Sequence, residues 1–121
     1  PNMVISGKKA ANRAAPQAVA EATLRVLRRH VPPAVPGIAF LSGGQSSAEA
    51  TLHLALMNKM GPLPWALTFS YGRALQDTAL KAWGGAPASF AAAQKEFAKR
   101  ARLNGLAAAG GYAADMETQA A

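Results

Sequence analysis

The sequence contains no cysteine and only two histidines, His30 and His53. The absence of cysteine excludes a disulfide scaffold, a thiolate metal site and a cysteine nucleophile. Two histidines alone cannot build a zinc site. The chain also lacks an apolar run near the roughly 20 residues that a membrane-spanning helix needs, and shows no basic-then-apolar signal segment. We therefore expect a soluble protein without a metal centre.

Acidic residues and large apolar side chains are also scarce. Asp and Glu number 6 against 13 Lys and Arg, so the formal net charge is +7. Alanine contributes 30 residues, whereas Leu, Ile, Val and Phe together contribute only 23 of the 121. A chain of this length forms one domain at most, and so few large side chains bury little surface. We expect a piece of a larger protein, with sequence missing before Pro1.

The middle of the chain reads as a helix followed by a strand and a second helix. From Pro16 apolar residues recur with helical spacing until a proline-rich connector interrupts them. The apolar run 37–41 then predicts a short strand buried on both faces. A Gly-Gly turn follows, and Ser46 with Glu49 has the spacing of a capping box that opens a helix to about Lys59. The unit is strand, glycine turn, helix.

The same order of elements repeats in the second half. Residues 65–70 predict another buried strand, and a helix follows over 74–83, ended by Gly84-Gly85. A last, basic helix over 90–108 carries apolar residues at 90, 93, 97 and 101. Two successive strand-helix units predict parallel strands joined by right-handed crossovers. Two strands are too few for such a sheet, so we expect either an open doubly wound sheet or a closed (β/α)₈ barrel, completed by further strands.

Two turns follow the predicted strands and carry the candidate site. In both alternatives ligands bind at the carboxyl ends of the strands. Ser42, Gly43 and Gly44 form the first turn, where glycines let backbone N–H groups approach an anion near a helix N-terminus. Gly72 and Arg73 form the second turn, where the guanidinium can grip two phosphate oxygens. The turns should lie side by side and bind phosphate, although each alone could be only a tight connection.

The basic charge admits nucleic acid or a membrane surface as a partner. The charged clusters are Arg25, Arg28 and Arg29 on one helix and Lys95, Lys99, Arg100 and Arg102 on another. No aromatic residues are interleaved with them and no recognition motif accompanies them, which favours solvated outer helix faces instead. His53 lies on an apolar-rich helix and is better interpreted as a packing residue than as a catalytic base.

Several longer motifs resemble one family. They are Pro1-Asn2-Met3-Val4, VPPAVPGI at 31–38, FLSGGQS at 40–46, PWALTFSYGRALQ at 64–76 and ALKAWGG at 79–85. Together they resemble class I fructose-bisphosphate aldolase, over residues 1 to about 112 and over the C-terminal third of the family's length. The resemblance implies an α/β fold, the C-terminal portion of a (β/α)₈ TIM barrel, with two βα units, a C-terminal helix and a tail. Residues 1–109 would belong to the barrel domain, and residues 110–121 would form a flexible tail.

The resemblance also implies a chemistry. The family cleaves fructose 1,6-bisphosphate reversibly into dihydroxyacetone phosphate and glyceraldehyde 3-phosphate through a lysine Schiff base, with no metal or other cofactor. The Schiff-base lysine precedes the Pro-Asn-Met motif, so no catalytic residue is expected in this chain and the isolated chain should be inactive. Ser42, Gly43 and Gly44 would bind a substrate phosphate after the seventh strand, and Gly72 with Arg73 would complete that site after the eighth.

Partners and alternatives follow from the same likeness. The expected partners are a sugar phosphate and the rest of the subunit, in a homotetramer of the cytoplasm or the chloroplast, without nucleic acid or membrane. The family's terminal tyrosine is not matched by Tyr112, since the chain ends Gln119-Ala120-Ala121. Two alternatives stay open: an inactive aldolase-derived fragment with a structural role, and a basic binding module that retains barrel sequence.

Overall fold

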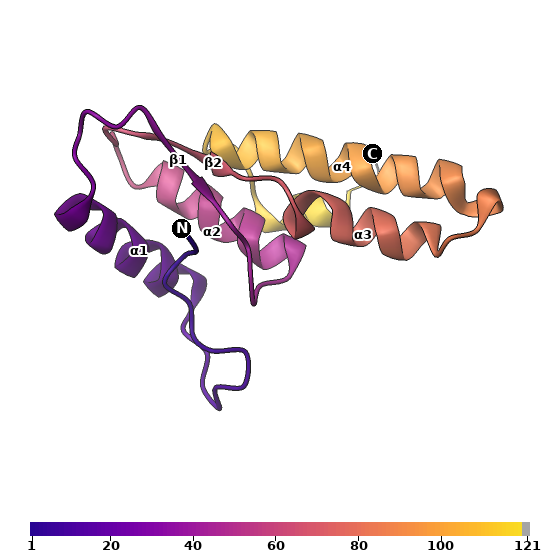
Figure 1. The fold of residues 1–121 in the computed structure, drawn as a ribbon, viewed down its shortest axis with the longest axis horizontal. Coiled ribbons are helices and arrows are strands. Elements are labelled where there is room, and N and C mark those ends of the chain that lie inside the picture. Colours follow the sequence, from indigo (N-terminus) through magenta and orange to yellow (C-terminus); the bar gives the residue numbers. More distant parts are fainter. Residues whose placement is uncertain (120–121) are drawn as a thin grey trace.

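Helices and strands alternate along the chain, as the sequence predicts (Figure 1). The computed structural model describes residues 1–119. The elements in order are α1 (Pro16–His30), β1 (Gly37–Phe40), α2 (Ser47–Lys59), β2 (Ala66–Phe69), α3 (Arg73–Trp83), the 3₁₀ turn η1 (Pro87–Ser89), α4 (Phe90–Ala108) and the 3₁₀ turn η2 (Ala114–Glu117). Each predicted strand and helix is found, and its ends differ from the prediction by about one residue.

The two strands are parallel neighbours, which confirms the predicted pair of strand-helix units. Their register sets Phe40 opposite Phe69. On β1's side of the sheet, Asn2 forms an isolated parallel bridge with Leu41, and the Leu41 N–H donates to the Pro1 carbonyl at 2.8 Å. The first residues, for which the sequence predicts only an irregular loop, therefore pair with the end of β1.

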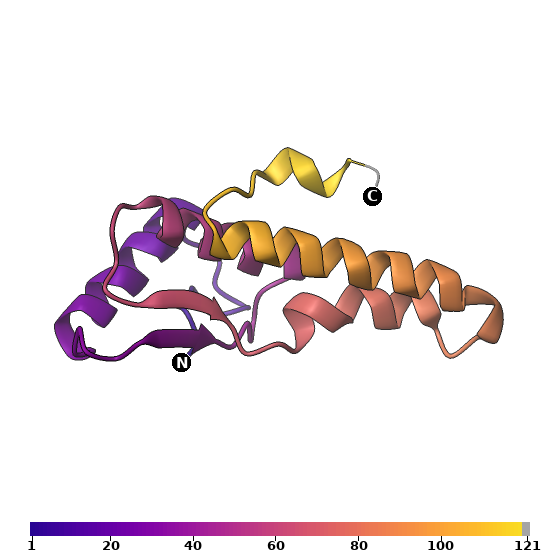
Figure 2. The ribbon, with the colours of Figure 1, turned by 90° about the horizontal axis from the view of Figure 1, so that it is seen from above.

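The two faces of the sheet differ. The buried face consists of Ile38, Phe40, Leu67 and Phe69, each at most 7% exposed. The opposite face carries Gly37, Ala39 and Ala66, all of which are exposed. Within this chain only one face of the strands is covered, because α2, α4 and η2 all lie on one side of them (Figure 2). Burial of the opposite face by further strands stays a prediction.

Helix α2 lies at the centre of the apolar core. The predicted capping box is present: the Ser46 hydroxyl accepts from the Glu49 N–H, and the Glu49 carboxylate accepts from the Ser46 N–H. Leu54 of α2 is fully buried, together with Leu24 of α1 and Leu103 of α4. The core thus lies between the helices and one face of the sheet. Its contacts hold α2, which begins beside the first glycine turn, in a fixed position against the strands.

Helices α3 and α4 form an antiparallel hairpin that extends beyond the sheet (Figure 1). Gly84 ends α3 in the left-handed conformation, with φ of 56°, as predicted. The apolar residues predicted along α4 do not form its buried face, since Phe90 is 59% exposed and Phe97 is 44% exposed. Phe90, Ala93 and Phe97 line an apolar groove of about 640 Å³ together with Leu80 and Trp83 of α3.

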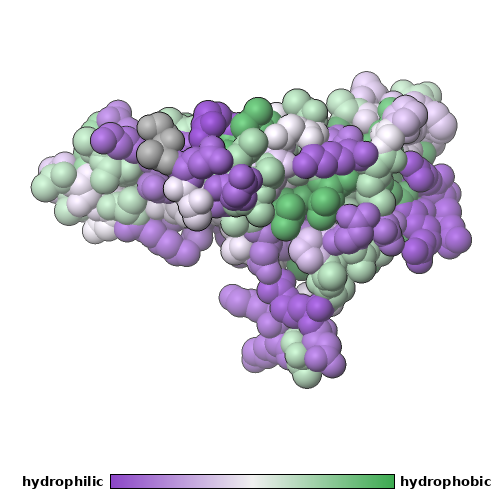
Figure 3. All heavy atoms as spheres, turned by 180° about the vertical axis from the view of Figure 1, so that it is seen from behind, coloured by the Kyte–Doolittle hydropathy of each residue, from purple (hydrophilic) through white to green (hydrophobic). Residues whose placement is uncertain are grey.

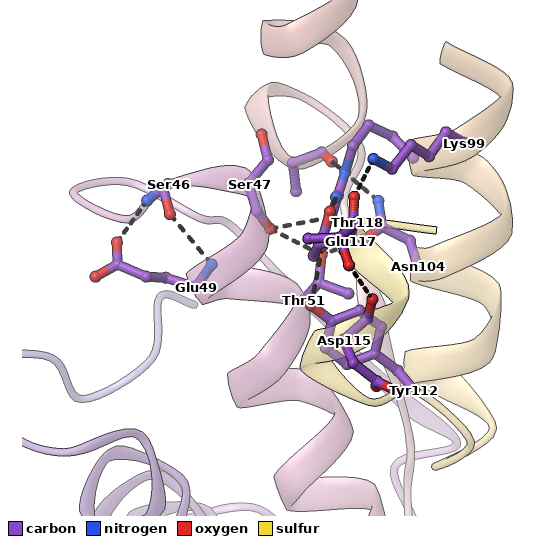
Figure 4. A network of polar contacts seen from close by, with 12 residues as sticks. Ser46, Ser47, Glu49, Thr51, Lys99, Asn104, Tyr112, Asp115, Glu117 and Thr118 are labelled. Atoms are coloured by element: carbon purple, nitrogen blue, oxygen red, sulfur yellow. Dashed lines mark hydrogen bonds and ion pairs between the residues drawn. The ribbon is translucent and has the colours of Figure 1, made fainter. Parts of the chain in front are cut away.

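The buried face of α4 is instead partly polar, and it holds the C-terminal segment (Figure 4). Arg100 is 2% exposed, donates to the Thr51 hydroxyl and forms an ion pair with Glu117 at 2.6 Å. The Tyr112 hydroxyl donates to the same carboxylate at 2.9 Å, and the Tyr112 ring is buried. The prediction that Arg100 lies on a solvated face is wrong, because the Glu117 carboxylate and nearby oxygens satisfy its guanidinium.

The segment 110–119 accordingly packs against α2 and α4, which its small and polar composition did not indicate. The predicted mobility of residues 110–121 stays a prediction. Its last two residues, Ala120 and Ala121, lie outside the described residues.

Candidate functional site

The two glycine turns lie at the same end of the parallel strands. The first turn closes with a hydrogen bond of 3.2 Å from the Gln45 N–H to the Ser42 carbonyl. The second turn leads directly into α3, whose first residue is Arg73. The hydroxyl of Ser47, at the start of α2, donates to the Arg73 carbonyl at 3.0 Å and links the two turns.

The backbone of the first turn requires glycine at one position. Gly44 has φ of +78°, and a Cβ atom there would lie 3.1 Å from the Ile5 methyl carbon. Within residues 1–119, neither the Gly43 nor the Gly44 N–H donates to a protein acceptor. A Cβ atom on Gly72 would meet no atom within 4 Å, so the space beside the second turn is open. Backbone donors and open space are what an anion requires.

The two helices that begin at this site differ in their first turns. The first turn of α2 is satisfied by its own capping box, and the hydrogen bond from the Ser46 N–H lowers the pKa of Glu49. Helix α3 has Gly72 as its N-cap and no side-chain cap, so the partial positive charge at its N-terminus is not offset by a side chain. The α3 terminus is therefore the better of the two for an anion.

A cavity of about 430 Å³ lies beside the turns. It is lined by Lys8, Arg13, Gly44, Gln45, Ser46, Glu49, Arg73, Asp77 and Lys81. Of the five residues predicted to bind phosphate, Gly44 and Arg73 line this cavity. Ser42, Gly43 and Gly72 are half-buried in the adjoining turns and do not line it.

The charge of the cavity is positive. Its lining has four cationic side chains and two carboxylates, a difference of +2. Arg13 pairs with Glu49 at 2.9 Å, and Lys81 pairs with Asp77 at 2.7 Å. Among the described residues no ion pair engages Arg73, so its guanidinium remains available to a ligand.

The sequence reasoning missed the loop that supplies Lys8 and Arg13. In the structure this loop projects from the body between the first residues and α1, as a hydrophilic lobe (Figure 3). The Arg13 guanidinium donates to the Gly44 carbonyl at 3.4 Å as well as to Glu49. Its basic residues were visible in the sequence, but no local pattern indicated that the loop returns to the glycine turn.

Other parts of the molecule offer less to a phosphate. The α3–α4 groove is larger than the cavity at the turns, yet no charged residue lines it. Arg25, Arg28 and Arg29 are exposed on α1, as predicted. Residues 1–119 contain no cluster of acidic and histidine side chains that could hold a metal ion. None of the helices within residues 1–119 has an apolar stretch of the length that a membrane span requires.

His53 lies behind the first turn and is buried, with 4% exposure. Burial lowers the pKa of its imidazole, so the ring is neutral near pH 7. Its Nδ1 atom lies 2.7 Å from the Gln45 side-chain oxygen. The structure confirms the interpretation of His53 as a packing residue and adds a hydrogen bond that the sequence did not reveal.

Comparisons with known proteins agree on one family. The family model described as class-I fructose-bisphosphate aldolase matches residues 1–121. The non-muscle aldolase of Lethenteron camtschaticum is 61% identical over 93% of this chain and 31% of its own length. Fructose-bisphosphate aldolase A of Salmo salar is 57% identical and the chloroplastic aldolase 2 of Pisum sativum 54%, each over 100% of this chain and 34% of its own length.

A solved structure gives the same result for the fold. The Plasmodium falciparum fructose-bisphosphate aldolase, determined with TRAP and a small-molecule inhibitor, superposes with a TM-score of 0.87 at 50% identity. The match covers 93% of this chain and 33% of that one. The chain thus spans about a third of the length of its relatives. Its two βα units correspond to the C-terminal portion of their TIM barrel, and the chain belongs to the class I fructose-bisphosphate aldolase family.

Proposed function

We propose that this chain supplies the phosphate-binding half-site of a class I fructose-bisphosphate aldolase. The complete subunit would be a lyase that cleaves fructose 1,6-bisphosphate reversibly into dihydroxyacetone phosphate and glyceraldehyde 3-phosphate. The observation that supports this most directly is the cavity between the two turns, where Arg73 has no carboxylate partner among residues 1–119. A dianionic phosphate ester matches that charge and the free backbone donors.

Each predicted residue has a distinct role in this proposal. The N–H groups of Gly43 and Gly44 and the Ser42 hydroxyl would donate to phosphate oxygens. Arg73 would donate a charge-assisted pair of hydrogen bonds from the neighbouring turn. Gly72 would leave the α3 N-terminus open to the same phosphate. These contacts hold the substrate without taking part in bond cleavage.

Bond cleavage would depend on a lysine outside this chain, immediately before Pro1. A protonated imine on that lysine would act as an electron sink for the carbanion formed when the C3–C4 bond breaks. Binding the phosphate fixes the ketose carbonyl near the lysine, so the chain would contribute positioning to the reaction. The proposal includes a homotetramer and a location in the cytoplasm or the chloroplast.

A complete subunit tests the proposal. Residues 1–121 can replace the matching third of the Salmo salar aldolase A, which is 57% identical over this whole chain. We expect this chimera to cleave fructose 1,6-bisphosphate and to form a borohydride-trapped adduct with dihydroxyacetone phosphate. A folded chimera that forms no adduct would contradict the proposed function.

Arg73→Ala in the chimera tests the half-site itself. Loss of charge-assisted hydrogen bonds should raise KM for fructose 1,6-bisphosphate by about 10- to 100-fold. Arg28→Ala is the matched control, because Arg28 is exposed on α1 away from the turns. Equal KM values for Arg73→Ala and Arg28→Ala would show that Arg73 does not bind the phosphate.

A further inference from the structure

A chain of side-chain hydrogen bonds runs from α2 to the first glycine turn. His53 Nδ1 lies 2.7 Å from Gln45 Oε1, and Gln45 Nε2 donates to Asn2 Oδ1 at 3.2 Å. Asn2 Nδ2 in turn donates to the Gly43 carbonyl at 2.9 Å. His53 is 4% exposed and Gln45 8%, so water competes little for the bond between these two side chains, whereas the bond from Asn2 to the Gly43 carbonyl is exposed.

One backbone group fixes which atom donates and which accepts in each hydrogen bond between His53 and Gly43. The Met3 N–H donates to Asn2 Oδ1 at 2.8 Å, and a backbone N–H can only donate. Asn2 therefore presents its amide nitrogen to the Gly43 carbonyl and its oxygen to Gln45. Gln45 must then present its own oxygen to His53, and neutral His53 must carry its proton on Nδ1.

The bond to the Gly43 carbonyl controls the peptide unit between Gly43 and Gly44. Glycine on both sides leaves this peptide plane few steric limits, so it can rotate between alternative turn conformations. In a trans peptide the carbonyl and the following N–H point in opposite directions. Asn2 therefore turns the Gly44 N–H away from itself, and this is one of the N–H groups without a protein acceptor within residues 1–119.

We propose that Asn2, Gln45 and His53 are positioning residues that orient the Gly43–Gly44 peptide toward the substrate phosphate. The inference rests on the proposed function and extends it, because none of the three side chains is itself assigned to the ligand. Asn2 acts on the turn directly. Gln45 adds a second donor, beside the Met3 N–H, that holds the Asn2 side chain in place, and His53 in turn holds the Gln45 side chain. The three residues come from different segments, so the turn is held by tertiary contacts.

The test uses the active chimera and two substitutions at His53. His53→Leu removes the donor at nearly constant volume, whereas His53→Asn restores an N–H near the position of Nδ1. We expect His53→Leu to raise KM for fructose 1,6-bisphosphate and the inhibition constant of inorganic phosphate by about tenfold, with little change in kcat. His53→Asn should recover most of that loss. His30→Leu is the control, because His30 is exposed at the end of α1.

Asn2→Ala removes the hydrogen bond to the Gly43 carbonyl, and it should raise KM for fructose 1,6-bisphosphate at least as far as His53→Leu does. Equal KM and phosphate inhibition in all variants would overturn the positioning role while leaving the proposed function intact. A loss of kcat that follows the loss of thermal stability and that His53→Asn does not rescue would also overturn it. An inactive parent chimera would instead contradict the proposed function, and this inference with it.

Discussion

The turn end of the sheet and the α3–α4 hairpin expose opposite kinds of surface. At the turn end, polar groups from four segments are hydrogen-bonded to one another around a cavity of net positive charge. Along the hairpin, Leu80, Trp83, Phe90 and Phe97 are between 42% and 59% exposed and no charged residue lines their groove. The chain thus organises its polar site internally, whereas much of its apolar surface stays in contact with solvent.

The largest expected effect concerns the isolated chain. Its exposed apolar surface and a two-stranded sheet with one uncovered face give too little burial for independent stability. We expect the isolated 121-residue chain to show no cooperative thermal unfolding and no aldolase activity, in contrast to the chimera. A sharp calorimetric transition for the isolated chain would contradict this expectation. It would show that the exposed apolar surface does not prevent folding and that the polar site forms without the rest of the subunit.

The ion pair of the C-terminal segment gives the next largest effect. Glu117→Ala leaves the buried Arg100 guanidinium without its carboxylate, and should destabilise the folded chimera by about 2 to 3 kcal/mol, since Glu117 is partly exposed. Urea unfolding would measure this. Adding Arg100→Met removes the stranded charge and should recover part of the loss, whereas Glu96→Ala is a control on the same helix. Equal midpoints for Glu117→Ala and Glu96→Ala would show that the pair does not hold the segment.

Two glycines sharpen the comparison between the regions. Gly44 in the turn and Gly85 in the hairpin both have φ of +78°, but only at Gly44 would an added Cβ atom meet a neighbour, the Ile5 methyl carbon at 3.1 Å. Alanine should cost about 1 kcal/mol at either site for the backbone, and more at Gly44 because of the contact. Ile5→Val in the Gly44→Ala background should recover the excess. Identical urea-unfolding midpoints for the two alanine variants would mean that the turn is no more tightly packed than the hairpin.

The smallest effect is expected on the hairpin surface. Phe97→Gln replaces an exposed ring, so the stability of the chimera should change by less than about 0.5 kcal/mol unless another part of the subunit covers it. Leu103→Gln on the buried face of the same helix is the contrasting variant. A loss of several kcal/mol for Phe97→Gln would show that the groove is buried in the complete subunit.

Local signals accounted for most of the fold. The Ser46 and Glu49 capping box, the glycine at position 84 and the proline-rich connector each act within a few residues, so the sequence predicted the elements and their order. The resemblance added the barrel, which the comparisons confirm. Strand adjacency followed from the alternation of strands and helices, and it placed the two glycine turns together.

Contacts between distant residues could not be predicted in this way. Asn2 meets Gly43 across 41 positions, and Arg100 meets Glu117 across 17. Arg100 lies on the same helical face as the buried Leu103 and Ala107, but its charge indicated a solvated residue. The ion pair with Glu117 of the C-terminal segment makes its burial favourable. The loop with Lys8 and Arg13 has no periodicity, so its position beside the turn depends on tertiary contacts alone.

The uncovered face of the sheet carries small side chains. Its positions are occupied by Gly37, Ala39, Ala66 and Thr68, which are among the smallest side chains available. The interior of a barrel is filled by layers of side chains from alternate strands, and an unfilled layer is costly. We therefore expect strands from elsewhere in the subunit to fill the space in front of this face, and enlarging Ala39 or Ala66 would compete with them for the same volume.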